Sequence, residues 1–440
     1  MFSALTIALA LAALSPSIAA EVIEDGLTVP AVSGLASDRT PFATPSHPAI
    51  RYAAGPTNNA VAALGEDIES GKVQLKYDDA SGYLPAVLEA LHIPVESQIL
   101  VFSKTSLQKL FIGPKNPRAI YFRDDVAVGY IRNAPMLEIV AHDVRQGAVF
   151  YVIDQRPGQP PSLGRRDGCL GCHESYNTVG VPGLLARSVA ADSNGVIFPR
   201  VENSIVDHRS PFATRWAGRY LTATAAPEQH LANLVVSDDL QSQSILADGA
   251  RSTAALSTEF DFTGYPSRHS DIVAHLVFDH QMHMLNLLTR IGWDARAALY
   301  GEQHAGSAPA LTEALLANIA REVVDYMLFV DETPLAAPVA GESGFAKKFA
   351  TAGPRDRNGR SLRQLDLQSR LMNYPCSYLI YSAAFDALPD QARAAIYGRM
   401  WQVLSGADTD EKYRRLAPSD RRAVVEILRE TKEGLPGYFK

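Results

Sequence analysis

The run AIYFRDDVAVGYIRNAPMLEIVAHDVRQGAVFYVIDQR, residues 119–156, decides the fold class. It consists of β-branched and aromatic segments separated by Asp, Asn, Gly and Pro, which is typical of short strands joined by turns. The FRDD sequence at 122–125 predicts the tip of a hairpin. Together with SQILVFSK at 97–104, the run predicts an antiparallel sheet over about 97–155.

The pattern changes in the second half of the chain. From about residue 270, apolar residues recur at the three- and four-residue spacing of amphipathic helices. The first and longest such run is residues 270–299. The whole chain is therefore expected to be an α+β protein, with a β-rich N-terminal part and a mainly helical C-terminal part. The other predicted helices cover residues 310–330, 363–372, 375–388, 390–405 and 419–433, where Ser419 is the expected N-cap of the last.

The N-terminus indicates export. MFSALTIALALAALSPSIAAEV opens the chain with an apolar run closed by Pro16, and Ser17 and Ala19 are placed for cleavage, so residues 1–20 are predicted to be a signal peptide and the periplasm is the expected location. No later uncharged run approaches the ~20 apolar residues of a membrane span, so none is expected. A formal net charge of −7 argues against a nucleic-acid partner.

The sequence CLGCH, residues 169–173, holds two of the three cysteines in the chain. Two cysteines one helical turn apart lie on one side of a helix, and the following histidine projects nearby. Their thiols can add to the vinyl groups of haem while the imidazole coordinates iron, which is why C-x-x-C-H indicates c-type haem attachment. Chance supplies the motif with a probability on the order of 10⁻⁴ at this composition.

Three other kinds of site account less well for the motif. A structural zinc site needs four ligands, and the remaining cysteine, Cys376, is distant in sequence. A thioredoxin-type pair lacks its βαβ context and leaves His173 without a role. A disulfide between Cys169 and Cys172 would be strained and would close almost no loop.

The segment CLGCHESYNTVGVPGLLARS, residues 169–188, resembles the haem-attachment segment of monohaem c-type cytochromes. The resemblance implies one covalent haem c on Cys169 and Cys172, with His173 as the proximal iron ligand. It also implies that the Pro182 carbonyl accepts a hydrogen bond from His173 Nδ1–H. It covers about twenty residues. The whole chain resembles exported bacterial proteins that carry one haem motif in a much larger body, which implies no particular activity.

The sixth iron ligand is left open by the sequence, because the chain has no methionine between residues 173 and 281. Four candidates are His208, His230, His280 and Met284. His280 and Met284 fall on the apolar stripe of the predicted helix at 270–299, so interior packing is the alternative interpretation of both. An iron with no sixth protein ligand is the other alternative.

Two arginines just before the motif, Arg165 and Arg166, are candidates to pair with the haem propionates, because a guanidinium binds carboxylates well. Three others in a charged loop are interpreted mainly as solvent-exposed: Arg355, Arg357 and Arg360. The expected organisation is a signal peptide over 1–20, an extended lead-in over 21–60, a β-rich domain over 61–160, a cytochrome-c-like haem segment over 161–235 and a mainly helical domain over 236–440.

These features favour a periplasmic monohaem c-type cytochrome that passes single electrons to a redox partner protein. One alternative is a haem enzyme of peroxidase-like type, or a gas- or peroxide-binding protein, with an open sixth position for a small-molecule ligand. There, His208 with Arg209, or His280, would act on the ligand. A second alternative is a structural or sensory haem protein that docks a partner. Whether the chain is an enzyme is left undecided.

Overall fold

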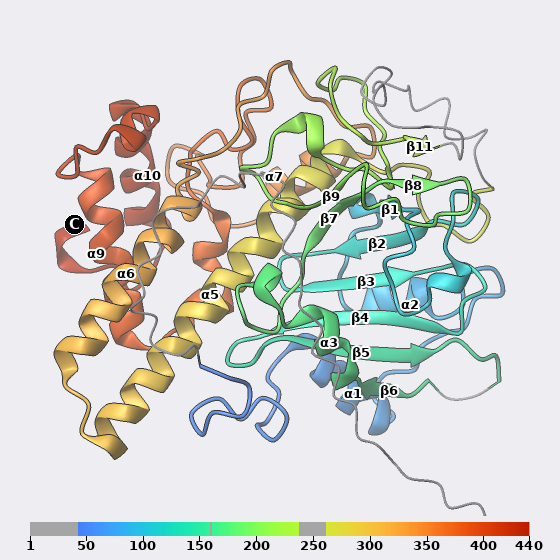
Figure 1. Cartoon of the computed structure of the whole chain (residues 1–440), viewed down its shortest axis with the longest axis horizontal. Helices are drawn as coiled ribbons and strands as arrows, with labels where there is room; N and C mark the ends of the chain where they lie inside the picture. The colour runs from blue at the N-terminus through green and yellow to red at the C-terminus, as the bar shows by residue number, and fades with distance from the viewer. Residues whose placement is uncertain (1–42, 159–160, 237–260, 440) are drawn as a thin grey trace, which may run out of the picture. The chain divides into compact units, whose positions relative to one another are not determined.

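Seven antiparallel strands form the main sheet in the order β10-β1-β2-β3-β4-β5-β6 (Figure 1). The computed structural model describes residues 43–158, 161–236 and 261–439. The predicted antiparallel sheet over 97–155 is confirmed, and residues 123–125 form the turn between β2 and β3. The strands are β1 Ile99–Val101, β2 Arg118–Phe122, β3 Val126–Tyr130, β4 Met136–Asp143, β5 Gly147–Asp154, β6 Leu163–Arg165 and β10 Arg219–Tyr220.

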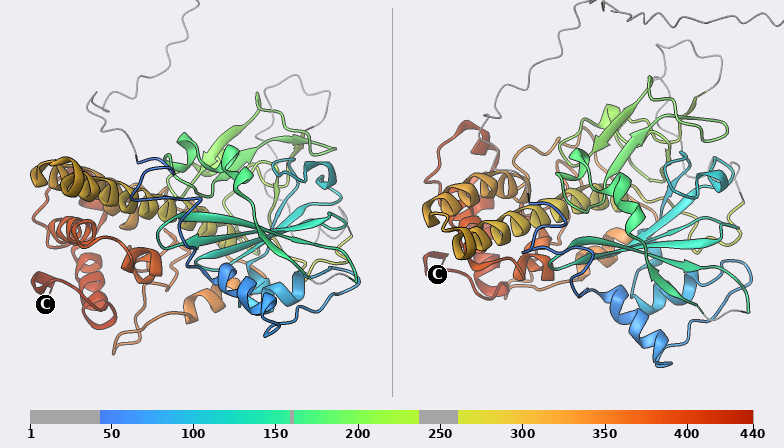
Figure 2. Two further views of the ribbon diagram at one scale, coloured as in Figure 1. Left: turned by 90° about the horizontal axis from the view of Figure 1, so that it is seen from below. Right: turned by 60° about the horizontal axis from the view of Figure 1, so that its bottom comes forward.

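The two faces of this sheet bury different cores. Alternate residues of a strand point to opposite faces, and on β4 Leu137 and Ile139 pack with helices α1 (Ala60–Glu69) and α2 (Leu84–Ala90), whereas Val140 packs with the segments on the other face. Figure 2 shows α1 and α2 below the sheet and the segment containing α3, β7 and β9 above it. That second face carries the C-x-x-C-H motif.

Helices dominate the C-terminal part, which confirms the α+β class. They are α5 Ile272–Ala305, α6 Pro309–Met327, α7 Phe345–Thr351, α8 Ala383–Asp386, α9 Asp390–Leu404 and α10 Pro418–Thr431, with α3 Leu170–His173 in the haem segment. Short 3₁₀ helices lie at Val95–Ser97, Lys109–Phe111, Asp167–Cys169, Tyr176–Thr178, Phe212–Thr214, Tyr378–Tyr381, Glu411–Arg415 and Gly437–Phe439.

Three helical predictions were wrong in detail. Residues 363–372 form a tight turn, because the Asp366 carboxylate accepts the N–H groups of Gln368 and Ser369. The predicted helix at 375–388 is broken at Ser382, whose side chain caps α8. Finally, α10 starts at Pro418 with Ala417 as its N-cap residue, so Ser419 lies inside the helix.

Two small sheets follow the C-x-x-C-H motif. Strands β7 (Ala186–Val189) and β9 (Asn203–Val206) pair antiparallel, and β8 (Ala191–Asp192) pairs in parallel with β11 (Val235–Val236). Residues 195–201 form no strand in the described structure, where Ile197 makes a single bridge to Ala191.

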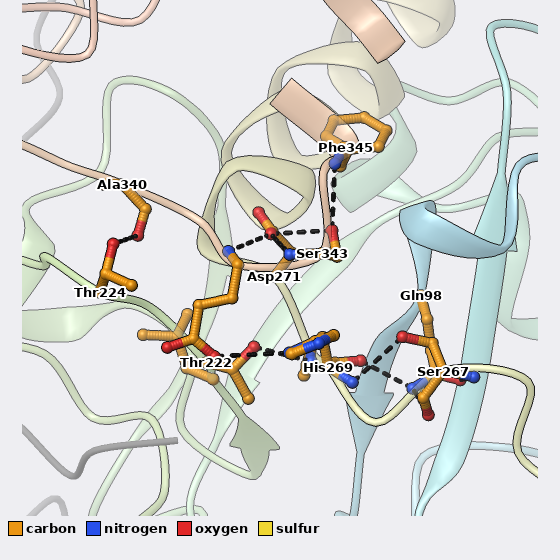
Figure 3. A network of polar contacts seen from close by, with 12 residues as sticks. Gln98, Thr222, Thr224, Ser267, His269, Asp271, Ala340, Ser343 and Phe345 are labelled. Carbon is orange, nitrogen blue, oxygen red and sulfur yellow. Dashed lines mark hydrogen bonds and ion pairs between the residues drawn. The ribbon is translucent and has the colours of Figure 1, made fainter. Parts of the chain in front are cut away.

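Asp271 ties the start of α5 to a distant loop (Figure 3). Its Oδ1 accepts the N–H of Val273 at 2.8 Å and caps the helix, while its Oδ2 accepts the N–H groups of Glu342 and Ser343 at 2.9 and 2.8 Å. Ser343 Oγ–H donates to the same oxygen at 2.8 Å. A Cβ at Gly341 would lie 2.2 Å from Oδ1, so this position leaves no room for a side chain.

Phe42–Lys440 forms one compact unit, in which the three expected parts 61–160, 161–235 and 236–440 contribute to a shared core. The lead-in was expected to be extended to residue 60; its described part contains turns before α1. The predicted signal peptide at 1–20 lies outside the described residues. Among the helices described here, none is long and apolar enough to cross a membrane.

Candidate haem-attachment site

The loop that carries the C-x-x-C-H motif, residues 167–181, leaves and rejoins the sheet along the same strand. Arg166 N–H donates to the Phe150 carbonyl at 2.8 Å as the chain leaves β6, and Ala148 N–H donates to the Pro182 carbonyl at 3.0 Å as it returns. Phe150 and Ala148 are two residues apart on β5 and point to the same face. Residues 167–181 therefore form a loop whose two ends are fixed at β5 (Figure 1).

The two motif cysteines lie on a continuous helical turn made by the 3₁₀ helix Asp167–Cys169 and α3. Both thiols are free; Cys172 is exposed and Cys169 is half-buried. Burial raises the pKa of Cys169, and the neighbouring charge of Glu138 adds to the effect. The third cysteine, Cys376, is fully buried, and burial raises its pKa, as suits a small core residue. The motif thiols are thus unpaired and reachable.

His173 is held in one orientation. Its ring packs against Phe150 with centroids 4.8 Å apart, and its Nδ1 lies 3.0 Å from the Gly183 carbonyl oxygen. Because that oxygen can only accept, Nδ1 carries the proton and Nε2 has the free lone pair. Burial lowers the pKa of His173, so the ring is neutral at pH 7. No described residue hydrogen-bonds Nε2, and a neutral imidazole with a supported Nδ1–H is the form that ligates a metal.

Pro182 does not have the role that the resemblance implied. Its carbonyl accepts from Ala148 of β5, and the next residue, Gly183, supplies the acceptor for His173. Asn286 of α5 secures this turn, because its side chain accepts from Leu184 N–H at 3.2 Å and donates to the Leu184 carbonyl at 2.7 Å. Because the Pro182 carbonyl accepts a hydrogen bond from β5, the carbonyl that faces His173 is that of the next residue, Gly183.

The sheet face beside the motif is incompletely covered. One row across the sheet is half-buried, and two of its members lack side chains: Ile120, Gly129, Glu138, Val152 and Gly164. Two apolar side chains near it are largely exposed, Leu110 at 86% and Tyr176 at 85%. The loop before Leu110 is tied to this face, since Ser106 Oγ donates to Glu138 at 2.5 Å. The face beside the motif therefore carries half-buried positions and two exposed apolar side chains.

The two propionate candidates point in different directions. Arg165 lies opposite Tyr151, on the α1 side of the sheet, and donates to Asp167, Gln146 and the Tyr52 carbonyl. Its guanidinium is therefore engaged by protein acceptors, and its pairing with a propionate stays a prediction. Arg166 lies on the motif side, is exposed, and has Met136 Sδ 3.8 Å from its Nη1.

The structure places the four sixth-ligand candidates elsewhere. His280 Nδ1 lies 2.8 Å from His208 Nδ1, and His280 Nε2 lies 2.8 Å from Ser377 Oγ, so both its nitrogens are engaged. Thr289 lies two and a half turns after His280 in α5, so the two side chains project from opposite sides of the helix. The Thr289 hydroxyl lies 2.9 Å from His142 Nε2 on β4, so the Thr289 side of α5 faces the sheet. His280 therefore points away from the sheet face that carries the motif.

Met284 and His230 are also interior residues. Met284 is fully buried and lies close to His280 in angle around α5, which bears out the packing alternative for both. His230 packs edge-on against Trp216, and its Nδ1 accepts from Ala232 N–H at 3.2 Å. None of the contacts described for these candidates involves residues 167–183.

Sequence spacing missed four residues of this site: Arg118, Met136, Glu138 and Gly183. The first three are brought to the motif by strand pairing, and only the alternation along β2 and β4 could have shown that they share a face. Within the described ranges, no group of three or more His, Cys, Asp or Glu side chains is placed to hold a metal ion. Comparison of the chain with protein-family models, curated proteins and solved structures finds no match.

Proposed function

We propose that the chain is a periplasmic monohaem c-type cytochrome that transfers single electrons to or from a redox partner protein. The observation that carries the proposal is the state of His173, whose Nδ1–H is bound by Gly183 and whose Nε2 has no hydrogen-bond partner among the described residues, in a motif with two unpaired thiols. The residues fit haem c: Cys169 and Cys172 would hold it by thioether bonds and His173 through iron. Bound there, the group supplies one-electron chemistry.

The protein's own contribution is to fix the proximal ligand. The Gly183 carbonyl selects the His173 tautomer and increases the basicity of Nε2. Phe150 packs against the ring and keeps water from that side. The exposed Leu110 and Tyr176 provide apolar surface that a porphyrin edge would cover.

A second candidate function is a haem protein with an open sixth position that binds a small molecule. The observation that favours it is the placement of His208, His230, His280 and Met284 in other surroundings. Met136 is the first residue to substitute if the iron proves six-coordinate, because it lies on the same face of β4 as Glu138 and contacts Arg166.

The test is covalent haem attachment to the mature chain produced with a cytochrome maturation system. We expect a mass increase of one haem and a c-type pyridine haemochrome spectrum. The double variant Cys169→Ala/Cys172→Ala should lose covalent haem, and the control Cys376→Ala should keep it. Absence of covalent haem from the unmodified chain would overturn the proposal. Spectra with and without carbon monoxide then separate the two functions: an unchanged spectrum supports electron transfer, and a shift supports the open site.

A further inference from the structure

Arg118 is a half-buried cation whose hydrogen-bonding capacity is poorly used. Its side chain, at the start of β2, is 18% exposed, and its Nε is buried without a hydrogen-bond partner among the described residues. Its carboxylate partner, Glu138, has Oε2 3.5 Å from Nη1. Charge-assisted bonds of this type are usually about 2.7–2.9 Å long, so the pair is loose.

Glu138 is already committed to other donors. Its Oε1 accepts from Ser106 Oγ at 2.5 Å and from Gln108 Nε2 at 3.2 Å. These bonds hold the carboxylate toward the loop at 106–111 and leave Arg118 with one weak partner. A largely desolvated guanidinium is costly unless carboxylates satisfy it, so Arg118 has hydrogen-bonding capacity left for a second carboxylate.

Arg118 adjoins the motif. Arg118 and Ile120 lie on the same face of β2, and Ile120 packs against the core to which Cys169 also belongs. Glu138, the partner of Arg118, lies opposite Val152 of β5, two residues from Phe150, whose ring packs against His173. The guanidinium is thus close to the expected iron ligand.

We propose that Arg118 binds a propionate carboxylate of the haem, an inference that rests on the proposed haem function. Haem carries two carboxylates, and the fork of an arginine matches carboxylate geometry. The sheet surface is open at Gly164, where an added Cβ would meet no atom within 4 Å. Arg166 is the second cation on this face and is exposed.

The experiment compares haemin with its dimethyl ester, which lacks the two carboxylates. The full mature chain carrying Cys169→Ala/Cys172→Ala keeps His173 and is titrated with each ligand. We expect haemin to bind at least about tenfold more tightly than the ester, the factor for one charge-assisted hydrogen bond. When Arg118→Gln is added, haemin and its dimethyl ester should bind with nearly equal affinity. The matched control is Arg357→Gln, because Arg357 is exposed and paired with Glu430.

If the Cys169→Ala/Cys172→Ala chain binds haemin and its ester equally well, the proposal is overturned before any arginine is substituted. A ratio that Arg118→Gln leaves unchanged would also overturn it. Arg118→Lys, which keeps the charge and loses the fork, should give an intermediate ratio if the glutamine variant fails to fold.

The covalent holoprotein gives an independent readout. Removing a positive charge beside the haem favours the oxidised form, so Arg118→Gln should lower the reduction potential while Arg357→Gln leaves it unchanged. If the Cys169→Ala/Cys172→Ala chain binds neither haemin nor its ester, the change in reduction potential is the deciding measurement. An unchanged potential in Arg118→Gln would then contradict the assignment of Arg118 to a propionate. A chain that forms no haem c at all instead contradicts the proposed function, so the two failures are distinct.

Discussion

His173 Nδ1 lies 3.0 Å from the Gly183 carbonyl oxygen, on a turn that leaves no space for a larger residue at position 183. A Cβ there would lie 2.2 Å from Oδ1 of Asn286, which holds Leu184. Gly183→Ala should therefore displace the turn and weaken the support of His173. We expect a loss of about 1–3 kcal/mol in the free energy of unfolding, measured by urea denaturation of the apoprotein.

Gly168→Ala is the control for this substitution, because a Cβ at Gly168 meets no atom within 4 Å. It should leave the unfolding midpoint unchanged within error. Equal effects of the two substitutions would show that the turn at Gly183 is not restrained by Asn286.

Arg165 and Arg166 should differ in their effects on stability although they are adjacent. Arg165 donates to Asp167, Gln146 and the Tyr52 carbonyl, and Arg165→Ala leaves those acceptors unpaired, so we expect a loss of about 2–3 kcal/mol. Arg166→Ala removes an exposed side chain and should change stability by no more than about 0.5 kcal/mol. Thermal unfolding of the apoproteins tests both, and the reverse ranking would contradict the assigned orientations.

Met284→Leu should leave the haem environment unchanged. Met284 is fully buried on the side of α5 that carries His280, and a volume-conserving change there costs less than about 1.5 kcal/mol. The holoprotein should keep the absorption spectrum and carbon monoxide response of the unmodified chain. A changed axial-ligand signature would mean that Met284 reaches the iron.

Acid should destabilise the protein through its buried neutral histidines. Burial lowers the pKa of His280 to about 3 and that of His230 to about 4. Below pH 6.5 the unfolded chain takes up protons that the folded chain does not, so each such group costs roughly 1.4 kcal/mol per pH unit until its folded pKa is reached. Above pH 6.5 both histidines are neutral in the folded and in the unfolded chain, so they no longer reduce the free energy of unfolding. Burial raises the pKa of Glu332 to about 7, which acts in the opposite direction and offsets one histidine.

Urea unfolding at pH 7 and pH 5 measures this effect. His230→Gln should reduce the pH dependence of the unfolding free energy by about one proton. The exposed His304 is the matched control, and His304→Gln should keep the slope of the unmodified chain. A slope that His230→Gln does not alter would contradict a buried, neutral His230.

Asp271 should be among the residues most sensitive to substitution. Asp271→Ala removes the cap of α5 and the acceptor for the N–H groups of Glu342 and Ser343 (Figure 3), so we expect a loss of about 2–4 kcal/mol. Asp271→Asn retains one acceptor oxygen and should cost less. Asn59→Ala, which removes the cap of α1 alone, should cost about 1 kcal/mol in the same chemical-denaturation assay.

The sequence patterns predicted those parts of the structure that depend on interactions between residues close together in the chain. The strands at 119–156 and the long helix at 272–305 follow from side-chain alternation and helical spacing, and the C-x-x-C-H motif is itself a local signal. The turn at Asp366 was missed because one side-chain acceptor outweighs a helical pattern there. Arg118 could not be assigned from spacing, since only the pairing of β2, β3 and β4 brings it to the motif.

The attachment of both ends of the haem loop to β5 has a consequence for folding. Closing a flexible loop costs conformational entropy. Here the backbone hydrogen bonds at Phe150 and Ala148 offset that cost. Strand pairing thus places the two ends of residues 167–181 without using the side chains of Cys169 and Cys172. A chain with serine at positions 169 and 172 should therefore reach the same fold.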